Sequence, residues 1–135
     1  MNLKDLVRVY IAYICSILEY CCVVWSSSLT IAQGEALERV QKVSLKIILG
    51  PVYVNYQSAL SGLELETLRI RREQLCLSFT KKRLKSQRHS VLFPVEPVTH
   101  NHQPRNVELF TVNYARTEKY RKSAIPYMQR KLNFL

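Results

Sequence analysis

The chain has 135 residues, which suits one domain and is long enough to bury roughly two-thirds of its unfolded surface. Apolar residues make up 47% of it, as in an ordinary globular protein, and twenty Lys and Arg against ten Asp and Glu leave a net charge of +10. The excess is uneven, at +1 over residues 1–63, +4 over 64–104 and +5 over 105–135. A basic second half favours polyanionic partners, although a solvated basic face without a partner has the same composition.

The four cysteines, Cys15, Cys21, Cys22 and Cys76, do not form a disulfide framework. Cys21 and Cys22 are adjacent, and a bond between neighbouring cysteines is strained. The sequence also has no signal peptide with a small-residue cleavage site. We therefore expect a reducing compartment, nuclear or cytoplasmic.

The first predicted helix runs from Leu3 to about Ser26 without glycine or proline, and Asn2 is positioned to cap it. Its apolar length nearly matches the thickness of a bilayer. Arg8 and Glu19 lie eleven residues apart, about three turns, so they are expected to share one face. A single polar stripe favours a helix in a protein core, since a charge inside a membrane costs a few kcal/mol. We expect a core helix and no membrane.

The second predicted helix begins at Thr30, after the break at residues 26–28. Thr30 and Gln33 have the spacing of a capping box. Gly50 is suited to the left-handed conformation that ends a helix, and Pro51 prevents its continuation. The apolar periodicity is carried by Leu37, Val40, Ser44, Ile47 and Ile48. Because few residues join the two helices, we expect an antiparallel hairpin.

Asn55 is expected to start a short helix through Leu60, and a third long helix follows from about Glu64 to Ser86. The expected buried face of this third helix comprises Leu65, Leu68, Leu75, Cys76 and Phe79. The opposite side carries a row of polar residues, with Lys81 beside it: Arg71, Gln74, Ser78, Lys82 and Lys85. A phosphate backbone can follow such a row, and an ordinary solvated face has the same pattern.

Beyond Arg88 the pattern changes to a loop, marked by Pro94, Pro97 and Pro104. Weak alternation over residues 107–114 predicts a short strand, and Ser123 is positioned to cap a last short helix. The expected fold class is all-α, with an antiparallel helical hairpin, a third long helix and an irregular basic C-terminal segment. The expected organisation is a helical domain over residues 1–88 and a loop-rich basic segment with a short terminal helix over 89–135.

A second basic cluster lies near the end, where Tyr114 and Tyr120 alternate with cations. Aromatic rings among cations stack exposed bases while the charges hold phosphates, and tyrosines equally fill protein cores. Neither basic surface has the features of base-specific reading, so backbone contacts are expected. The candidate nucleic-acid-binding residues are Arg71, Lys81, Lys82, Lys85, Arg116, Lys119, Arg121 and Lys122.

Metal binding and enzymatic catalysis lack sequence support. The residues that suggest a zinc site are Cys21, Cys22, His89, His100 and His102. They do not have the paired spacings of structural zinc sites, so no metal or cofactor is expected. No serine lies in a Gly-x-Ser-x-Gly elbow, and three glycines in all form no phosphate-binding loop.

Several segments together resemble one protein family. The carrying segments are Glu19-Tyr20-Cys21-Cys22-Val23-Val24-Trp25, Leu37-Glu38-Arg39-Val40-Gln41-Lys42, Ile47-Ile48-Leu49-Gly50, residues 56–60, 63–65, 71–72, 88–90 and 92–94, Arg116-Thr117, Tyr120-Arg121-Lys122-Ser123-Ala124-Ile125-Pro126 and Leu132-Asn133, with Leu68. Together they resemble the region just downstream of the polymerase domain in reverse transcriptases of non-LTR retrotransposons. The likeness extends over nearly the whole chain.

The resemblance implies a parent enzyme that copies RNA into DNA with metal ions held by clustered aspartates. Here Asp5 is the only aspartate, so catalysis by this chain is not expected. The leading interpretation is a non-catalytic region that contacts RNA or DNA backbone. The alternatives are a structural helical module that packs on the polymerase domain or another protein, and a relict without selected function.

Overall fold

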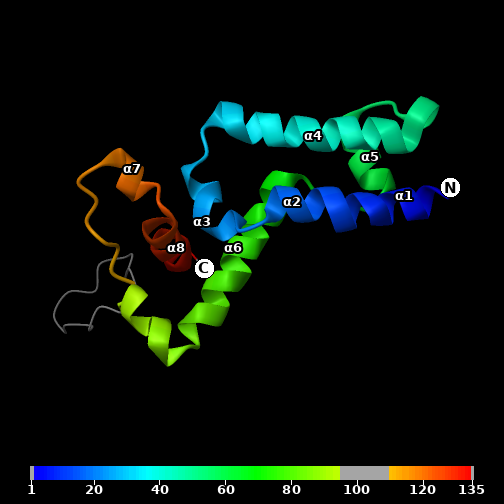
Figure 1. Cartoon of the computed structure of the whole chain (residues 1–135). Coiled ribbons are helices and arrows are strands. Elements are labelled where there is room, and N and C mark those ends of the chain that lie inside the picture. The colour runs from blue at the N-terminus through cyan, green and yellow to red at the C-terminus, as the bar shows by residue number, and fades with distance from the viewer. Residues whose placement is uncertain (1, 95–109, 135) are drawn as a thin grey trace. The chain divides into compact units, whose positions relative to one another are not determined.

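The computed structural model describes residues 2–94 and 110–134, and the regular elements in these two ranges are all helices (Figure 1). The expected all-α class is confirmed. The longest helices are α4 (Ile31–Leu49) and α6 (Leu68–Leu84). Residues 95–109, which include His100, His102 and part of the expected strand over 107–114, lie outside the described residues. In the described remainder of that strand, Phe110 forms an isolated β-bridge and residues 111–114 form no strand, so the expectation of a strand is wrong over 111–114.

The chain divides into two compact units. Unit 1 comprises Met1–Cys22 and Leu29–Gln74, and unit 2 comprises Val23–Ser28 and Leu75–Leu135. The division passes through α6, whose residues before and after Gln74 pack on different neighbours. The division between the two units therefore differs from the boundary at residue 88 that the sequence suggests. The expected third helix is confirmed but is shorter than the predicted span of 64–86, because its first turn is capped at Thr67.

The first helix of unit 1 changes its winding partway along. It consists of α1 (Leu3–Val9), a π-helix η1 (Tyr10–Cys15) and α2 (Ser16–Glu19). In an α-helix, residues five apart point about 140° away from each other, whereas wider i→i+5 winding aligns them. Tyr10 and Cys15 are five apart, and both are buried against Leu68. The π-helix therefore brings both side chains into one core.

The expected uninterrupted helix to Ser26 is wrong at Tyr20. Tyr20 has φ −56° and ψ 125°, and Cys21 has a positive φ of 49°, which approximates a type II turn. After this turn, α3 (Cys22–Trp25) and the short 3₁₀ helix η2 (Ser26–Ser28) follow. The turn ends the first apolar helix near the boundary between the two units.

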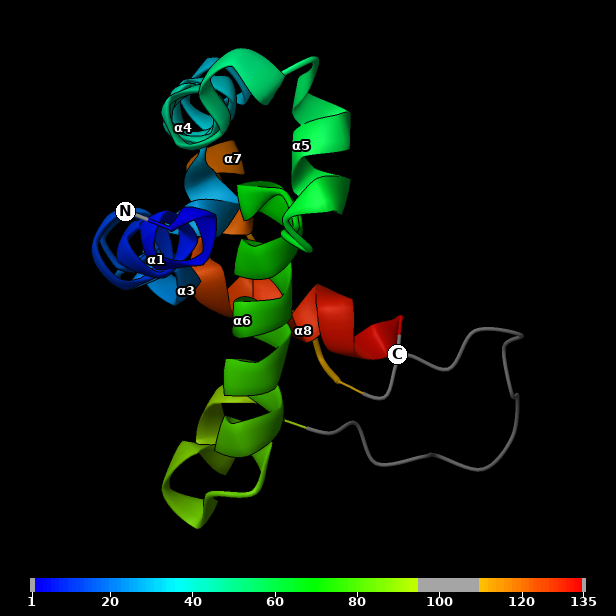
Figure 2. The ribbon, with the colours of Figure 1, turned by 90° about the vertical axis from the view of Figure 1, so that its right-hand side faces the viewer.

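In unit 1, α4 runs back alongside the first helix, as the sequence predicts for an antiparallel hairpin (Figure 1). Figure 2, which looks nearly along α1 and α4, shows the two helices side by side. The capping box of Thr30 and Gln33 is present, and Gly50 ends α4 with a φ of 51° that an L side chain rarely adopts. Pro51 follows in the 3₁₀ helix η3 (Gly50–Val52).

A second hydrophobic cluster in unit 1 joins α4 to α5 (Tyr56–Gly62), whose cap is the expected Asn55. Its buried members are Leu45, Ala59 and Leu60. The buried side of α4 is nevertheless rotated from the predicted one, because Gln41 is fully buried while Val40 is 43% and Ile47 74% exposed. The predicted face of α6 is also corrected, with Leu75 40% and Phe79 36% exposed. In their place, Arg72 and Thr80 are buried in line with Leu68 and Cys76.

The first helix is not the enclosed core helix that its composition suggests. Residues Leu3–Ser28 are long and apolar enough to cross a membrane, and 17% of the most apolar window is buried. A core helix of a soluble protein meets the same test of length and composition, so this finding alone is weak evidence for a membrane. Arg8 and Glu19 do not share a polar stripe, since their side chains are 81% and 12% exposed. The intervening π-helix changes the register between them.

Unit 2 has its own hydrophobic cluster of Phe93, Met128 and Leu132. Its further elements are the 3₁₀ helix η4 (Gln87–Leu92), α7 (Glu118–Arg121) and α8 (Ala124–Asn133). The expected last short helix is present, and its Met128 and Leu132 belong to this cluster. Ser123 occupies the N-cap position of α8, but its hydroxyl donates to the carbonyl of Tyr120 at 2.7 Å.

Candidate nucleic-acid interface

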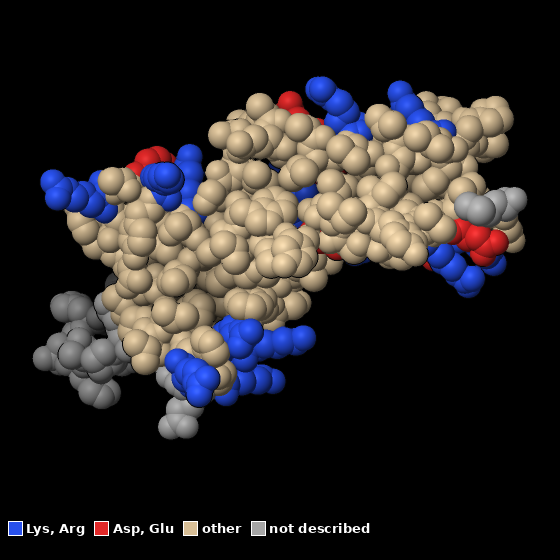
Figure 3. All heavy atoms as spheres, in the orientation of Figure 1, with Lys and Arg blue, Asp and Glu red and all other residues tan. Residues whose placement is uncertain are grey.

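The predicted basic residues at the C-terminal end of α6 lie in unit 2 and point to solvent. Lys81, Lys82 and Lys85 are exposed, and no ion pair joins them to an acid among residues 2–94 and 110–134. Figure 3 shows Lys and Arg side chains gathered over the last turns of α6. These three ammonium groups are therefore available to a phosphate backbone.

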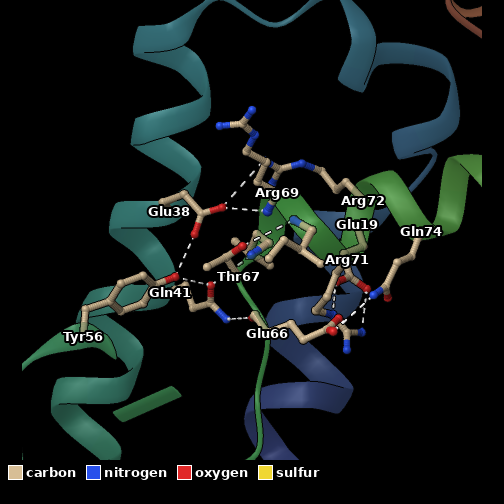
Figure 4. A network of polar contacts seen from close by, with 12 residues as sticks. Glu19, Glu38, Gln41, Tyr56, Glu66, Thr67, Arg69, Arg71, Arg72 and Gln74 are labelled. Atoms are coloured by element: carbon tan, nitrogen blue, oxygen red, sulfur yellow. Dashed lines mark hydrogen bonds and ion pairs between the residues drawn. The ribbon is translucent and has the colours of Figure 1, made fainter. Parts of the chain in front are cut away.

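Arg71, at the other end of α6, has a different environment in unit 1. Its guanidinium forms two parallel hydrogen bonds with the carboxylate of Glu19, through Nε to Oε1 and through Nη2 to Oε2, the second at 3.1 Å (Figure 4). The bond with Glu19 raises the pKa of Arg71, and its side chain is 33% exposed. Gln74 in turn donates to Glu66 at 3.1 Å. The first members of the predicted row thus already make polar contacts within the protein.

The second predicted cluster surrounds α7. Glu118 accepts a bond from Arg121 at 2.5 Å and lies 3.7 Å from the ammonium of Lys122. This hydrogen bond lowers the pKa of Glu118 and raises that of Arg121. Arg116 and Lys119 are also exposed, and in the described parts of the chain neither pairs with an acid. The cluster therefore presents two cations that share the single carboxylate of Glu118 and two that have no acidic partner in the described residues.

The two units differ strongly in charge. Unit 1 contains eight basic and seven acidic residues. The described part of unit 2 contains one acid, Glu118, against eleven basic residues: Lys81, Lys82, Arg83, Lys85, Arg88, Arg116, Lys119, Arg121, Lys122, Arg130 and Lys131. Nearly all of the net charge of the chain therefore belongs to unit 2, which agrees with the count along the sequence, since residues 1–63 carry +1.

The aromatic residues of this cluster are exposed to different degrees. Tyr114 is 89% exposed and Tyr120 44% exposed. The segment before Tyr114 is held to α8 by two amide side chains, Gln129 and Asn133. These anchoring residues were missed by the sequence prediction. An amide on the buried face of an amphipathic helix was the available signal, because a buried amide must find partners.

A polar network in unit 1 was also missed. Gln41 is fully buried in α4, and its Oε1 lies 2.6 Å from the Tyr56 hydroxyl and accepts a bond from the backbone N–H of Leu68 at 3.2 Å (Figure 4). Its Nε2 donates to the carbonyl of Glu66 at 3.0 Å. These bonds satisfy backbone groups at the beginning of α6, so the network positions that helix.

Glu38 completes the network from the same face of α4. Its Oε1 accepts from the backbone N–H of Arg69 at 2.7 Å, and its Oε2 lies 2.7 Å from the Tyr56 hydroxyl. A carboxylate at a helix N-terminus is stabilised by the helix dipole as well as by hydrogen bonds. Burial and the bond to Glu38 raise the pKa of Tyr56.

The residues considered for zinc do not come together in the described structure. Within residues 2–94 and 110–134, no three His, Cys, Asp or Glu side chains are placed to hold a metal ion. Cys21 is exposed and Cys22 buried, and His89 lies 3.1 Å from the hydroxyl of Ser86. His100 and His102 lie outside the described residues.

Comparisons with known proteins find no counterpart of this chain. No family model matches it, and no curated protein and no solved structure matches it either.

Proposed function

We propose that this chain is a non-catalytic part of a non-LTR retrotransposon reverse transcriptase that holds RNA or DNA by its phosphate backbone. The observation that carries the nucleic-acid part is the charge of unit 2, where eleven described cations face one carboxylate. The reverse-transcriptase origin rests on the sequence resemblance alone. The polymerase site would lie outside this chain, whose role would be to hold template or target beside it.

The proposed mechanism is electrostatic. Each Lys or Arg that neutralises a phosphate releases a condensed counterion, which favours binding through entropy and weakens it as salt rises. Five of the predicted binding residues are exposed and have no acidic partner in the described residues: Lys81, Lys82, Lys85, Arg116 and Lys119. Arg71 is a weaker candidate, because Glu19 already balances its charge.

A salt titration tests this proposal. The full chain is titrated into labelled single-stranded RNA and labelled duplex DNA at several salt concentrations, and affinity is read by fluorescence anisotropy. Five phosphate contacts predict that log affinity falls against log salt with a slope of about −3.5 for single strands and about −4.5 for B-DNA. Absent binding, or binding that salt does not weaken, by a folded and monodisperse sample would contradict it.

A second candidate function is a structural module that packs on a partner protein such as the polymerase domain. It is favoured by apolar side chains exposed on the two helices of the unit 1 hairpin. Ile17 is 73% and Ile47 74% exposed, with Tyr13, Tyr20 and Val43 also exposed. Exposed apolar patches larger than a few hundred Å² mark interaction surfaces.

This second candidate predicts that the isolated chain associates with itself or binds an apolar dye. Sedimentation velocity over a range of concentrations measures the association. The double variant Ile17→Ser, Ile47→Ser is expected to remain monomeric without loss of helix content, since both side chains are exposed. A wild-type chain that stays monomeric and does not bind the dye would rule against a large packing surface here.

A further inference from the structure

The most exposed aromatic ring in the described residues belongs to Tyr114, at 89%. A tyrosine this exposed contributes little to the core, because burial of apolar surface is what stabilises a fold. Its neighbours by contrast are fixed. The Tyr114 ring is therefore accessible to a binding partner, at the end of a segment whose backbone is hydrogen-bonded to α8.

Side chains of α8 hold the backbone just before Tyr114. The N–H of Phe110 donates to Oδ1 of Asn133 at 2.9 Å, and Nδ2 of Asn133 donates back to the carbonyl of Phe110 at 3.0 Å. The N–H of Asn113 donates to Oε1 of Gln129 at 3.0 Å. Gln129 is fully buried and also donates to the carbonyl of Leu92 at 2.8 Å. The backbone next to Tyr114 is therefore held in place at Asn113. Less conformational entropy is then lost when the Tyr114 ring is bound.

Cations follow Tyr114 at short range along the chain. Arg116 is two residues later, and two residues of extended chain span at most about 7 Å between Cα atoms. Lys119 is exposed in α7, while the nearby carboxylate of Glu118 is engaged by Arg121 and Lys122. The acid thus does not compete for Arg116 and Lys119, since no ion pair joins it to either in the described residues.

From this arrangement we infer that unit 2 binds single-stranded nucleic acid, with a base stacked on Tyr114 and the adjoining phosphates held by Arg116 and Lys119. The inference rests on the proposed backbone-binding function and specifies its substrate. In a duplex the faces of the bases are covered by their neighbours, and only their edges are exposed in the grooves. An exposed ring therefore adds affinity for single strands, in a way that tolerates any base.

The experiment compares ring removal with ring retention on the full chain. A labelled uridine oligonucleotide supplies the single strand, and a hairpin duplex of similar charge is the reference. Tyr114→Ala is expected to weaken binding to the single strand about five- to hundredfold and to leave duplex binding and the salt slope unchanged. Tyr114→Phe keeps the ring and is expected to bind the single strand like the wild type.

Tyr13→Ala is the matched control, because this ring is 69% exposed and belongs to unit 1, whereas the proposed contacts all belong to unit 2. It is expected to bind both nucleic acids as the wild type does. If Tyr114→Ala binds the single strand as tightly as the wild type does, the stacking inference is overturned while the backbone-binding function stands. If the wild-type chain binds neither nucleic acid, both are overturned. Circular dichroism of each variant confirms that it is folded.

Discussion

At the scale of single residues, Gln41 connects three parts of unit 1. Its amide bonds to the Tyr56 side chain of α5, to the backbone of Glu66 and to the first N–H of α6. A helix begins with N–H groups that have no partner within the helix, and leaving one buried and unsatisfied costs about 1–3 kcal/mol. The cost of losing this side chain is therefore larger than the net value of its hydrogen bonds.

Replacing Gln41 with alanine is expected to lower the free energy of unfolding by about 3 kcal/mol, because it leaves buried backbone groups without partners. Urea denaturation followed by circular dichroism measures the change. Gln57→Ala is the matched control on an exposed position of α5 and is expected to change stability by less than about 0.5 kcal/mol. Equal effects of the two substitutions would contradict the assigned role of Gln41.

Tyr56 links stability to alkaline pH. Its pKa in the folded chain is raised above the ordinary value of 10.0, first by burial and then by the bond to Glu38. Above about pH 10 the unfolded chain has released the tyrosine proton while the folded chain keeps it, so stability falls as pH rises. Below that pH the contribution is fully present.

The variant Tyr56→Phe is expected to lose about 1 kcal/mol at neutral pH with the hydrogen bond, and to lose less additional stability between pH 9 and 11 than the wild type. Urea denaturation at each pH provides the measurement. Parallel stability curves for the two proteins over this range would show that Tyr56 does not titrate as stated.

At the scale of elements, the Arg71–Glu19 pair fastens the first turn of α6 to α2. Two parallel hydrogen bonds fix the orientation of both side chains, and the carboxylate is 12% exposed. Removing one partner of such a pair leaves the other charge poorly solvated. Lys82, on the same helix, has an exposed ammonium and no acidic partner in the described chain. One helix therefore carries a structural cation at one end and a candidate binding cation at the other.

Arg71→Gln and Lys82→Gln remove one charge each and are expected to have opposite effects. The Arg71 variant is expected to lose about 2 kcal/mol of stability, a value reduced from that of a fully buried pair because Arg71 is one-third exposed, and to keep most of its affinity for nucleic acid. The Lys82 variant is expected to keep its stability and lose about one counterion from the salt slope. The two readouts are urea denaturation and the salt titration. If the salt slope of the Arg71 variant fell as much as that of the Lys82 variant, Arg71 would also contact a phosphate, contrary to the role assigned to it here.

At the scale of the whole molecule, the net charge is divided between the units. Unit 1 is nearly neutral and exposes apolar side chains on its hairpin, whereas unit 2 is strongly basic. Long-range attraction of a polyanion depends on local charge density rather than on the sum over the chain. Removing equal charge from the two units should therefore have unequal effects.

The triple variant with glutamine at Lys81, Lys82 and Lys85 is expected to lose about two units of salt slope on a single strand, at about 0.7 per phosphate contact. The control triple variant, with glutamine at the exposed Lys4, Arg39 and Lys46 of unit 1, removes the same charge and is expected to keep the slope. Fluorescence anisotropy at several salt concentrations gives both slopes. Equal losses would mean that total charge, and not its place in the fold, governs binding.

Local signals in the sequence predicted the helical class, the hairpin, the capping box at Thr30 and the short helix after Asn55. These features depend on residues close together in the chain, whose propensities act locally. The buried faces were predicted less well, because the apolar periodicity of α4 includes Ile47, which is exposed, and omits Gln41, which is buried. Gln41 is buried because it forms hydrogen bonds with backbone groups of Glu66 and Leu68, which are distant in the sequence. The local pattern around Gln41 does not specify these partners.

The sequence by itself determined the helical class, the caps at Thr30 and Asn55 and the basic character of the second half, because composition and short-range propensity suffice for these. The tertiary structure alone decided that Arg71, a member of the predicted basic row, pairs with Glu19. It also decided that the π-helix aligns Tyr10 with Cys15. Finally, it placed Gln129 and Asn133 where they bond the segment before Tyr114. Each of these contacts, apart from the π-helix, joins residues far apart in the chain. Such pairings arise when helices pack, since packing determines which exposed and which buried groups meet.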